Sequence, residues 1–189
     1  NHASHMDVPL LLTSLPERFR HRTAIAAGAD YFFDKRWKGA MWAFLINAFP
    51  IERLRISRRG ADLAGGLIAD GWNVIIFPEG GRSPDGWGQE HKPGAAFIAV
   101  RHGVPIVPVH LEGTRRILKR GAKMLKPSAT TITYGTPLRA DEGEDARAFA
   151  ARVERAVAAL ADEQVSDWWT AQRRASARTT PALSGPSNA

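Results

Sequence analysis

The sequence contains no cysteine, which excludes a disulfide framework, a thiolate metal site and a thiol nucleophile. It has no run of about 18 consecutive apolar residues, so no segment of it is expected to span a bilayer. No Gly-x4-Gly-Lys-Ser/Thr stretch occurs, which argues against a P-loop nucleotide enzyme. There is also no internal repeat.

Acidic residues are outnumbered by basic ones, with 19 Asp and Glu against 26 Lys and Arg, for a net charge of +7. This excess favours anionic partners, namely phosphorylated substrates, acidic lipid headgroups or nucleic acid, and composition does not choose among them. The 189 residues, 44% of them hydrophobic, are enough for one domain with its own core.

The rest of the chain is organised around residues 73–83, Asn-Val-Ile-Ile-Phe-Pro-Glu-Gly-Gly-Arg-Ser. The apolar run 74–77 predicts a buried strand that stops at the proline. Gly80 and Gly81 then allow a tight turn whose backbone N–H groups can converge on an anion, and Arg82 adds a forked positive group. Ligands of open α/β sheets bind beyond the carboxyl ends of strands, so this turn is a candidate anion site. The alternative is an ordinary turn with a surface arginine.

A histidine and an aspartate stand five residues apart at the N-terminal end. Asp7 and the following Pro9 predict the start of a helix with Asp7 as its cap. On one continuous helix His2 and Asp7 would lie about 140° apart, so they can meet only if His2 precedes the helix. Asp7 would then hold one ring nitrogen and leave the other as a base for a substrate hydroxyl. The alternative is an exposed histidine beside a helix cap, and His5 is interpreted as a bystander.

Predicted strands alternate with predicted helices along most of the chain, which indicates an α/β fold with a mostly parallel central sheet and helices on both faces. Two prolines make a central position uncomfortable for the segment 104–111. The predicted strands are Thr23–Ala27, a short one from Leu54, 74–77, Val104–Leu111 and Thr130–Tyr134. The predicted helices are Phe33–Phe49, Ala61–Ala69, Lys92–Arg101 and Asp145–Ala161. Ser57 is the proposed cap of the second helix, and the third is opened by Pro93 and ended by Gly103.

Two segments have an unusual composition. The predicted helix Phe33–Phe49 is basic at its N-terminal end and apolar afterwards, which suits a core helix, a lipid surface or a groove for a hydrocarbon chain. Its apolar residues fall near two stripes: Trp37, Met41, Phe44 and Leu45 on one, and Trp42, Ile46 and Phe49 on the other. Residues 166–189 are basic and end in a Pro/Ser/Gly-rich stretch, so we expect a disordered tail after one domain of residues 1–165.

Four segments in this order resemble the glycerolphosphate and lysophosphatidic acid acyltransferase family of phospholipid synthesis. They are His2-x4-Asp7, Phe49–Arg53, Phe77–Ser83 and Val104–Val109, with Lys92-Pro-Gly94 where the family has a Lys and a Gly. The resemblance extends over about residues 1–138. Gly81 stands where the family usually has Thr. The membrane-binding helices usually found upstream of the first motif are missing here, and we expect a segment to precede Asn1.

The resemblance implies transfer of a fatty acyl group from acyl-CoA or acyl-carrier protein to the hydroxyl of lysophosphatidic acid, with neither cofactor nor metal. His2 would take the hydroxyl proton, and Asp7 would hold the ring and stabilise its charged form. Backbone N–H groups near Gly80 and Gly81 are candidates for stabilising the oxyanion.

The acceptor phosphate would be held by Arg53 and Arg82 with the Gly80–Gly81 turn. Glu79 would orient these arginines or the loop, and Lys92 would support the motif. We expect these groups to converge with His2 on one side of the sheet.

Other assignments stay open at this point. The acceptor can be glycerol-3-phosphate or another lysophospholipid, and a non-enzymatic lipid- or anion-binding module would keep the basic surface and the apolar helix. The resemblance favours a chain attached peripherally to the cytoplasmic side of a membrane, and no nucleic-acid partner is expected.

Overall fold

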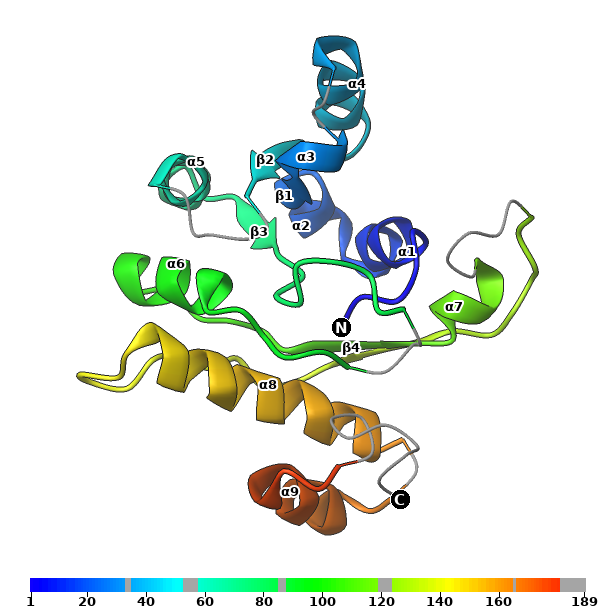
Figure 1. The fold of residues 1–189 in the computed structure, drawn as a ribbon, viewed down its shortest axis with the longest axis vertical. Helices are drawn as coiled ribbons and strands as arrows, with labels where there is room; N and C mark the ends of the chain where they lie inside the picture. Colours follow the sequence, from blue (N-terminus) through cyan, green and yellow to red (C-terminus); the bar gives the residue numbers. More distant parts are fainter. Residues whose placement is uncertain (33–34, 53–57, 85–87, 119–123, 165, 181–189) are drawn as a thin grey trace.

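The computed structural model describes residues 1–32, 35–52, 58–84, 88–118, 124–164 and 166–180. Its helices are α1 (Asp7–Ser14), α2 (Glu17–Arg20), α3 (Ala29–Phe32), α4 (Arg36–Ile46), α5 (Arg58–Ala69), α6 (Gly94–His102), α7 (Thr114–Ile117), α8 (Ala146–Asp162) and α9 (Trp168–Ala177). Its strands are β1 (Thr23–Gly28), β2 (Ala48–Ile51), β3 (Asn73–Ile75), β4 (Val109–Glu112) and β5 (Thr131–Tyr134). Figure 1 shows α4 at one end of the long axis and α9 at the other.

The strands form two sheets rather than one. Strands β2, β1 and β3 pair in that order and in parallel, which confirms the α/β class with a parallel sheet. Strands β4 and β5 form a separate antiparallel pair. The segments predicted as strands around 109 and 131 therefore do not belong to the parallel sheet, contrary to the expectation of one central sheet. The prolines at 105 and 108 have no N–H to donate to a neighbouring strand. In the segment before β4, Ile106 makes an isolated bridge to Leu138.

The two faces of the parallel sheet have different roles, because successive side chains of a strand point to opposite sides. Ala24 and Ala26 of β1 belong to a core cluster with residues of α5 and α6. Ile25 and Ala27, on the other face, line a cavity. Figure 1 shows α5 on one side of the sheet and α1 towards the other. The face of Ala24 therefore carries the packing against α5 and α6, and the C-terminal part of β1, Ile25–Gly28, borders the cavity.

Three predicted helices are confirmed as α5, α6 and α8, and one is shorter than expected. Helix α6 begins after Pro93 and ends at Gly103 (φ 64°), and α8 begins after Asp145, whose side chain caps it. The helix predicted to run to Phe49 ends instead at Asn47, which adopts a left-handed conformation with φ 50°. Phe49 consequently lies in β2 and in the core. The strand predicted from residue 54 and the proposed cap at residue 57 lie outside the described residues.

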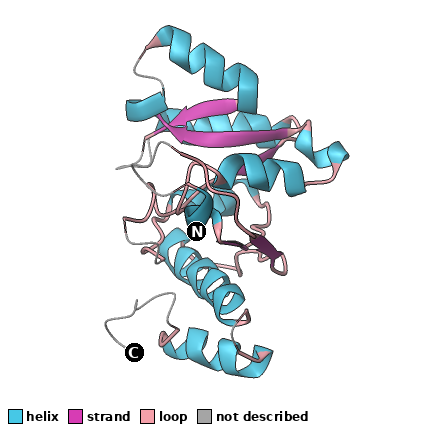
Figure 2. Ribbon diagram, turned by 90° about the vertical axis from the view of Figure 1, so that its right-hand side faces the viewer, coloured by secondary structure: helices cyan, strands magenta, loops and turns pink. Residues whose placement is uncertain are grey.

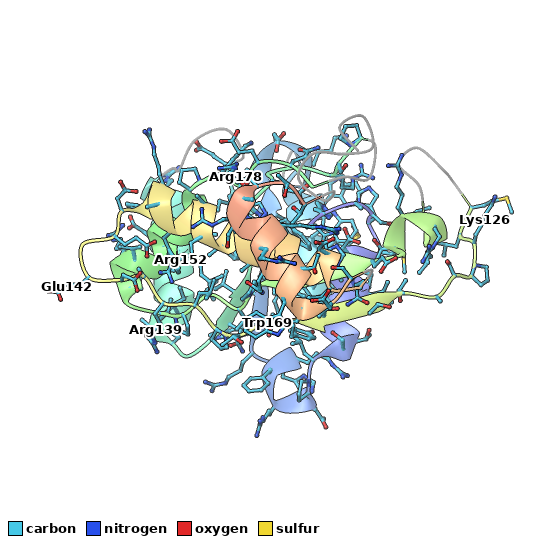
Figure 3. The ribbon with its side chains drawn as sticks, turned by 90° about the horizontal axis from the view of Figure 1, so that it is seen from below. Lys126, Arg139, Glu142, Arg152, Trp169 and Arg178 are labelled. Atoms are coloured by element: carbon cyan, nitrogen blue, oxygen red, sulfur yellow. The ribbon has the colours of Figure 1, made fainter. Side chains whose placement is uncertain are left out.

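The C-terminal segment is more ordered than its composition predicts. Residues 168–177 form helix α9, which packs against α8 (Figures 2 and 3), so the prediction of a disordered tail was wrong there. Ala171 and Ala175 are buried in this contact. Arg174 pairs with the buried Asp162 at 3.1 Å. Tertiary contacts of this kind cannot be recognised from composition.

No helix among the described residues combines the length and apolar character needed to cross a membrane.

Candidate active site

His2 and Asp7 meet as predicted, with His2 on the loop before α1 and Asp7 at the first residue of that helix. Nδ1 of His2 lies 2.6 Å from Oδ2 of Asp7. The capping role predicted for Asp7 was wrong, because Met6 is the N-cap residue and the Asp7 carboxylate binds groups that precede the helix. The loop therefore folds back over the carboxylate and presents the histidine.

The carboxylate of Asp7 is fully buried. Its Oδ2 also accepts hydrogen bonds from the N–H groups of Ala3 at 2.8 Å and Ser4 at 2.9 Å. Burial alone would raise the pKa of Asp7, but hydrogen bonds from His2, Thr114 and Ser4 outweigh it and hold the pKa below its usual value. Because an ionised carboxylate can only accept, Nδ1 of His2 carries a proton, and Nε2 is the ring nitrogen that faces away from this contact.

The main chain of His2 is held at both ends by the segment 77–83. The His2 N–H donates to Oε1 of Glu79 at 3.0 Å, and the His2 carbonyl accepts from the Ser83 N–H at 2.8 Å. The imidazole stacks on Phe77, with the ring centroids 4.2 Å apart. These contacts confirm the prediction that His2 and this segment converge.

Glu79 serves the histidine rather than the arginines for which it was predicted. Its side chain is buried, and its contact is with the His2 main chain. Burial raises the pKa of Glu79 to about 7, although the hydrogen bond from the His2 N–H acts in the opposite direction. A carboxyl group with a raised pKa thus contacts the main chain of the candidate base.

Asn1 joins this assembly to strand β4. Its side-chain NH2 donates to the Leu111 carbonyl at 2.8 Å, and its side-chain oxygen accepts from the Leu111 N–H at 2.7 Å. An amide side chain is suited to this position because it offers a donor and an acceptor together. Segments far apart in the sequence are thereby fixed around His2.

The Gly80–Gly81 turn has the predicted shape but a different use of its backbone. Gly80 has φ 73°, and its N–H donates to the Phe77 carbonyl at 3.1 Å, so the prediction that this N–H is available to an oxyanion was wrong. The Gly81 N–H has no hydrogen-bond partner among the described residues. A Cβ at Gly81 would meet nothing within 4 Å, so the threonine usual in the family would fit here.

Positive groups surround the turn. The side chain of Lys92 lies over Gly80, where an added Cβ would be 2.6 Å from Nζ. Arg82 is half-buried and makes no ion pair with a described residue. Burial, followed by the positive charge of Arg82, lowers the pKa of His5. The position of His5 close to Arg82 was not apparent from the sequence.

A cavity of about 720 Å³ opens onto these groups. Its wall includes His2, His5, the Gly80–Arg82 turn and Lys92, together with apolar residues of β1 and α4. Arg53, the second arginine predicted to bind phosphate, lies outside the described residues. Asn1, Ser83 and Thr114 were not predicted as site residues. Asn1 precedes the first motif and Ser83 ends the third, whereas Thr114 carries no sequence signal.

Comparison with known proteins gives three findings. The sequence profile of the Acyltransferase family matches residues 1–112. A 1-acyl-sn-glycerol-3-phosphate acyltransferase of Cocos nucifera is 31% identical over 148 residues, which cover 77% of this chain and 46% of that protein. The Homo sapiens 1-acyl-sn-glycerol-3-phosphate acyltransferase beta is 35% identical over 112 residues, covering 58% and 38%. The chain thus spans less than half the length of these two curated relatives.

A solved structure agrees with the sequence relatives. The crystal structure of the 1-acyl-sn-glycerophosphate (LPA) acyltransferase PlsC from Thermotoga maritima has a TM-score of 0.67 and 25% sequence identity. The match covers 88% of this chain and 65% of that one. Because the profile covers more than half of the 189 residues and includes both His2 and Asp7, the chain belongs to the acyltransferase family.

Proposed function

We propose that this chain transfers a fatty acyl group from a thioester donor to the free hydroxyl of a 1-acyl-glycerol-3-phosphate. The observation that carries the proposal is the 2.6 Å contact between His2 Nδ1 and the buried, ionised Asp7 at the wall of an apolar cavity. The named activity of the relatives supports the same reaction. The donor is acyl-CoA or acyl-carrier protein, since either supplies the thioester.

His2 acts as the general base. Its Nε2 takes the proton of the acceptor hydroxyl while that oxygen attacks the thioester carbonyl carbon. The tetrahedral intermediate then collapses, the C–S bond breaks, and the proton passes from Nε2 to the leaving thiolate. Asp7 keeps its negative charge throughout, orients the ring and stabilises the imidazolium that forms. The products are the ester and a free thiol.

The turn supplies the electrostatic part of the site. The Gly81 N–H is the candidate donor to the oxyanion, because the Gly80 N–H is already bound to Phe77. Arg82 holds the acceptor phosphate with Lys92 beside it, since a guanidinium matches a phosphate in geometry as well as in sign. Arg53 stays a predicted partner in this contact.

An acyl-transfer assay with purified protein tests the proposal. A panel of acceptors (1-acyl-glycerol-3-phosphate, glycerol-3-phosphate and a lysophospholipid with a larger headgroup) is combined with acyl-CoA and with acyl-carrier protein. We expect turnover with 1-acyl-glycerol-3-phosphate, and loss of about 10²- to 10⁴-fold of the rate in His2→Ala.

Circular dichroism and thermal melting of His2→Ala establish that the variant is folded. The matched control is His5→Ala, because His5 lines the same cavity, whereas the 2.6 Å contact with Asp7 is made by His2. Full activity in a folded His2→Ala protein would exclude this mechanism. Absence of turnover with every acceptor and donor, together with tight binding of lysolipid, would favour the non-enzymatic binding module.

A further inference from the structure

The positive charge of the chain is concentrated in one segment. Residues 113–126 contain six of the 26 basic residues and none of the 19 acidic ones, so the rest of the chain is close to neutral. The six are Arg115, Arg116, Lys119, Arg120, Lys123 and Lys126, and those at 119, 120 and 123 lie outside the described residues. The proposed acyl transfer uses none of them.

Four residues of this segment form an exposed surface, which we call the α7 surface: Arg116, Met124, Leu125 and Lys126. Met124 is 77% exposed and Leu125 60%, and both basic side chains are exposed as well. Arg116 lies on α7, and the Lys126 N–H donates to the Ile117 carbonyl of that helix at 2.9 Å. Figure 3 shows Lys126 and α7 at one edge of the molecule. Two cations and two apolar side chains therefore lie together on the outside of the fold.

The segment is attached to the loop that carries the candidate base. Ser4 of that loop donates its hydroxyl to the Leu118 carbonyl at 2.9 Å. Nη2 of Arg115 donates to the Pro84 carbonyl at 3.1 Å, and Pro84 directly follows the segment that holds the His2 main chain. The α7 surface is thereby fixed beside the candidate active site.

We propose that the α7 surface docks an acidic protein that carries the acyl thioester, so that acyl-carrier protein is a donor for this chain. The use of the docked thioester rests on the proposed acyl transfer, whereas the docking itself does not. Exposed cations attract an acidic partner and orient it during the encounter. Protein interfaces combine an apolar centre with a polar rim and are enriched in Met and Arg, which is the composition of this surface.

The other thioester donor, acyl-CoA, fits this surface less well. A nucleotide is usually held in a concave site that buries most of it. The four side chains of the α7 surface are all described, and none of them lines the site cavity. Phosphate groups also have no use for the exposed side chains of Met124 and Leu125. The combination of charge and apolar contact therefore favours a protein partner.

A lipid surface also fits less well. Segments that lie in a membrane interface are typically amphipathic helices with a broad apolar face. Residues 124–130 form neither helix nor strand, and Pro127 follows Lys126 directly. Two apolar side chains on an irregular loop do not provide such a face.

The chain offers a matched pair of arginines for the test. Arg116 on α7 and Arg173 on α9 are both exposed. The described contact of each is with a neutral oxygen at 3.4 Å, the Ala129 carbonyl and the Thr170 hydroxyl respectively. Replacing either arginine by glutamate changes the net charge by the same amount. A difference between the two variants consequently reports the position of the charge and not its total.

Steady-state acyl transfer with two donors that carry the same acyl chain tests the docking. The kcat/KM for acyl-carrier protein should fall about tenfold in Arg116→Glu, because an acidic side chain then repels the acidic partner. High salt should narrow this difference from the wild type. The kcat/KM for acyl-CoA in Arg116→Glu, and both values in Arg173→Glu, should stay close to the wild type. Lys126→Glu repeats the test if Arg116→Glu does not melt like the wild type.

Three results of this assay would overturn the proposal. They are an equal loss with both donors, an equal loss in Arg173→Glu, and no loss with acyl-carrier protein in a folded Arg116→Glu or Lys126→Glu protein. The first would assign the charge to the site itself, and the second would show an effect of net charge alone.

Direct binding separates the docking from the proposed function. The full chain is titrated calorimetrically at low salt with carrier protein that bears phosphopantetheine but no acyl group. We expect Arg116→Glu and Leu125→Ser each to bind about tenfold more weakly than the wild type, and Arg173→Glu to bind equally well. Absence of binding by the wild type would overturn the proposal. So would unchanged carrier binding in Leu125→Ser together with weaker sedimentation with phosphatidylglycerol vesicles, since the surface would then face lipid. If the wild type binds the carrier through Arg116 but transfers to no acceptor, the docking stands and the proposed function fails.

Discussion

The site and the α8–α9 region both contain buried carboxylates, but these carboxylates bind different kinds of group. In the α8–α9 region, Asp162 pairs with Arg174 at 3.1 Å and Glu154 pairs with Arg178 at 3.2 Å (Figure 3 shows Arg178 at the end of α9). In the site, the described contacts of Asp7 and Glu79 include no arginine, and Arg82 meets no described carboxylate.

The partner of each charged group determines whether that group is available to a substrate. An arginine that neutralises a buried carboxylate stabilises the fold and is already occupied. A buried carboxylate that binds an imidazole instead changes what that ring can do, and an arginine without an acidic partner can bind a phosphate. The two regions differ in the group that each buried carboxylate binds, and not in residue type or burial.

The largest effect is expected when the partner in the site is changed. Asp7→Asn removes the charge that orients the His2 ring and stabilises its protonated form, so kcat should fall by about 10²- to 10⁴-fold. The measurement is steady-state acyl transfer, with thermal melting as the check on folding. A loss of less than about threefold in a folded variant would show that the dyad geometry does not serve catalysis.

The second effect concerns stability and its dependence on pH. The pKa of Glu79 is about 7 in the folded chain against an ordinary value of 4.5, so the folded form keeps a proton that the unfolded form releases between these values. The stabilising contribution is fully present below pH 4.5 and is lost as pH rises through 7. Glu79→Gln keeps the acceptor for the His2 N–H and removes this titration.

We therefore expect urea unfolding to show Glu79→Gln gaining stability over the wild type between pH 5 and pH 8, by up to about 3 kcal/mol. At pH 4 the two proteins should differ little. Parallel stability curves across this range would contradict a raised pKa at Glu79.

The third effect tests whether an arginine without an acidic partner binds the substrate phosphate. Arg82→Ala should lower kcat/KM for a phosphate-bearing acceptor by about 10- to 100-fold, since a charge-assisted contact is worth about 1.5–3 kcal/mol. Arg82→Lys should recover part of the loss, and use of the acyl donor should change little. Equal losses with the acceptor and its phosphate-free analogue would assign Arg82 a structural role.

The sequence was sufficient for features that depend on local chemistry. The limits of α6 follow from a helix-opening proline and a closing glycine. The apolar run 74–77 also predicts a strand at the right place, but β3 covers only Asn73–Ile75 and is half-buried, so the predicted length and full burial were wrong. The His2–Asp7 pair could be predicted because a loop before a helix is the one local geometry that lets residues at this spacing meet. Gly80 and Arg82 could be predicted as site residues because both lie in the turn that follows the run 74–77.

The remaining features depend on contacts between distant segments. Helix α9 forms in a basic segment because Arg174 and Arg178 find buried carboxylates on α8. The hydrogen bond between the Asn1 side chain and the Leu111 carbonyl joins residues 110 positions apart. The use of the Gly80 N–H within its own turn depends on the fold of that turn, and the identity of the residues does not reveal it.

The smallest effect is expected in the α8–α9 region, where it should appear in stability and leave catalysis unchanged. Arg174 is partly exposed, but its partner Asp162 is buried, so Arg174→Met leaves a buried carboxylate without its ion pair. The cost should be about 1–2 kcal/mol of unfolding free energy, less than for a fully buried pair because solvent already screens the guanidinium. The neighbouring Arg173 supplies the control, since its described contact is with the Thr170 hydroxyl at 3.4 Å and with no carboxylate. Arg173→Met should unfold like the wild type in urea, and both variants should keep the wild-type kcat/KM. A loss of activity in a folded Arg174→Met protein would break the comparison, because it would mean that paired charges of this region also act on the site.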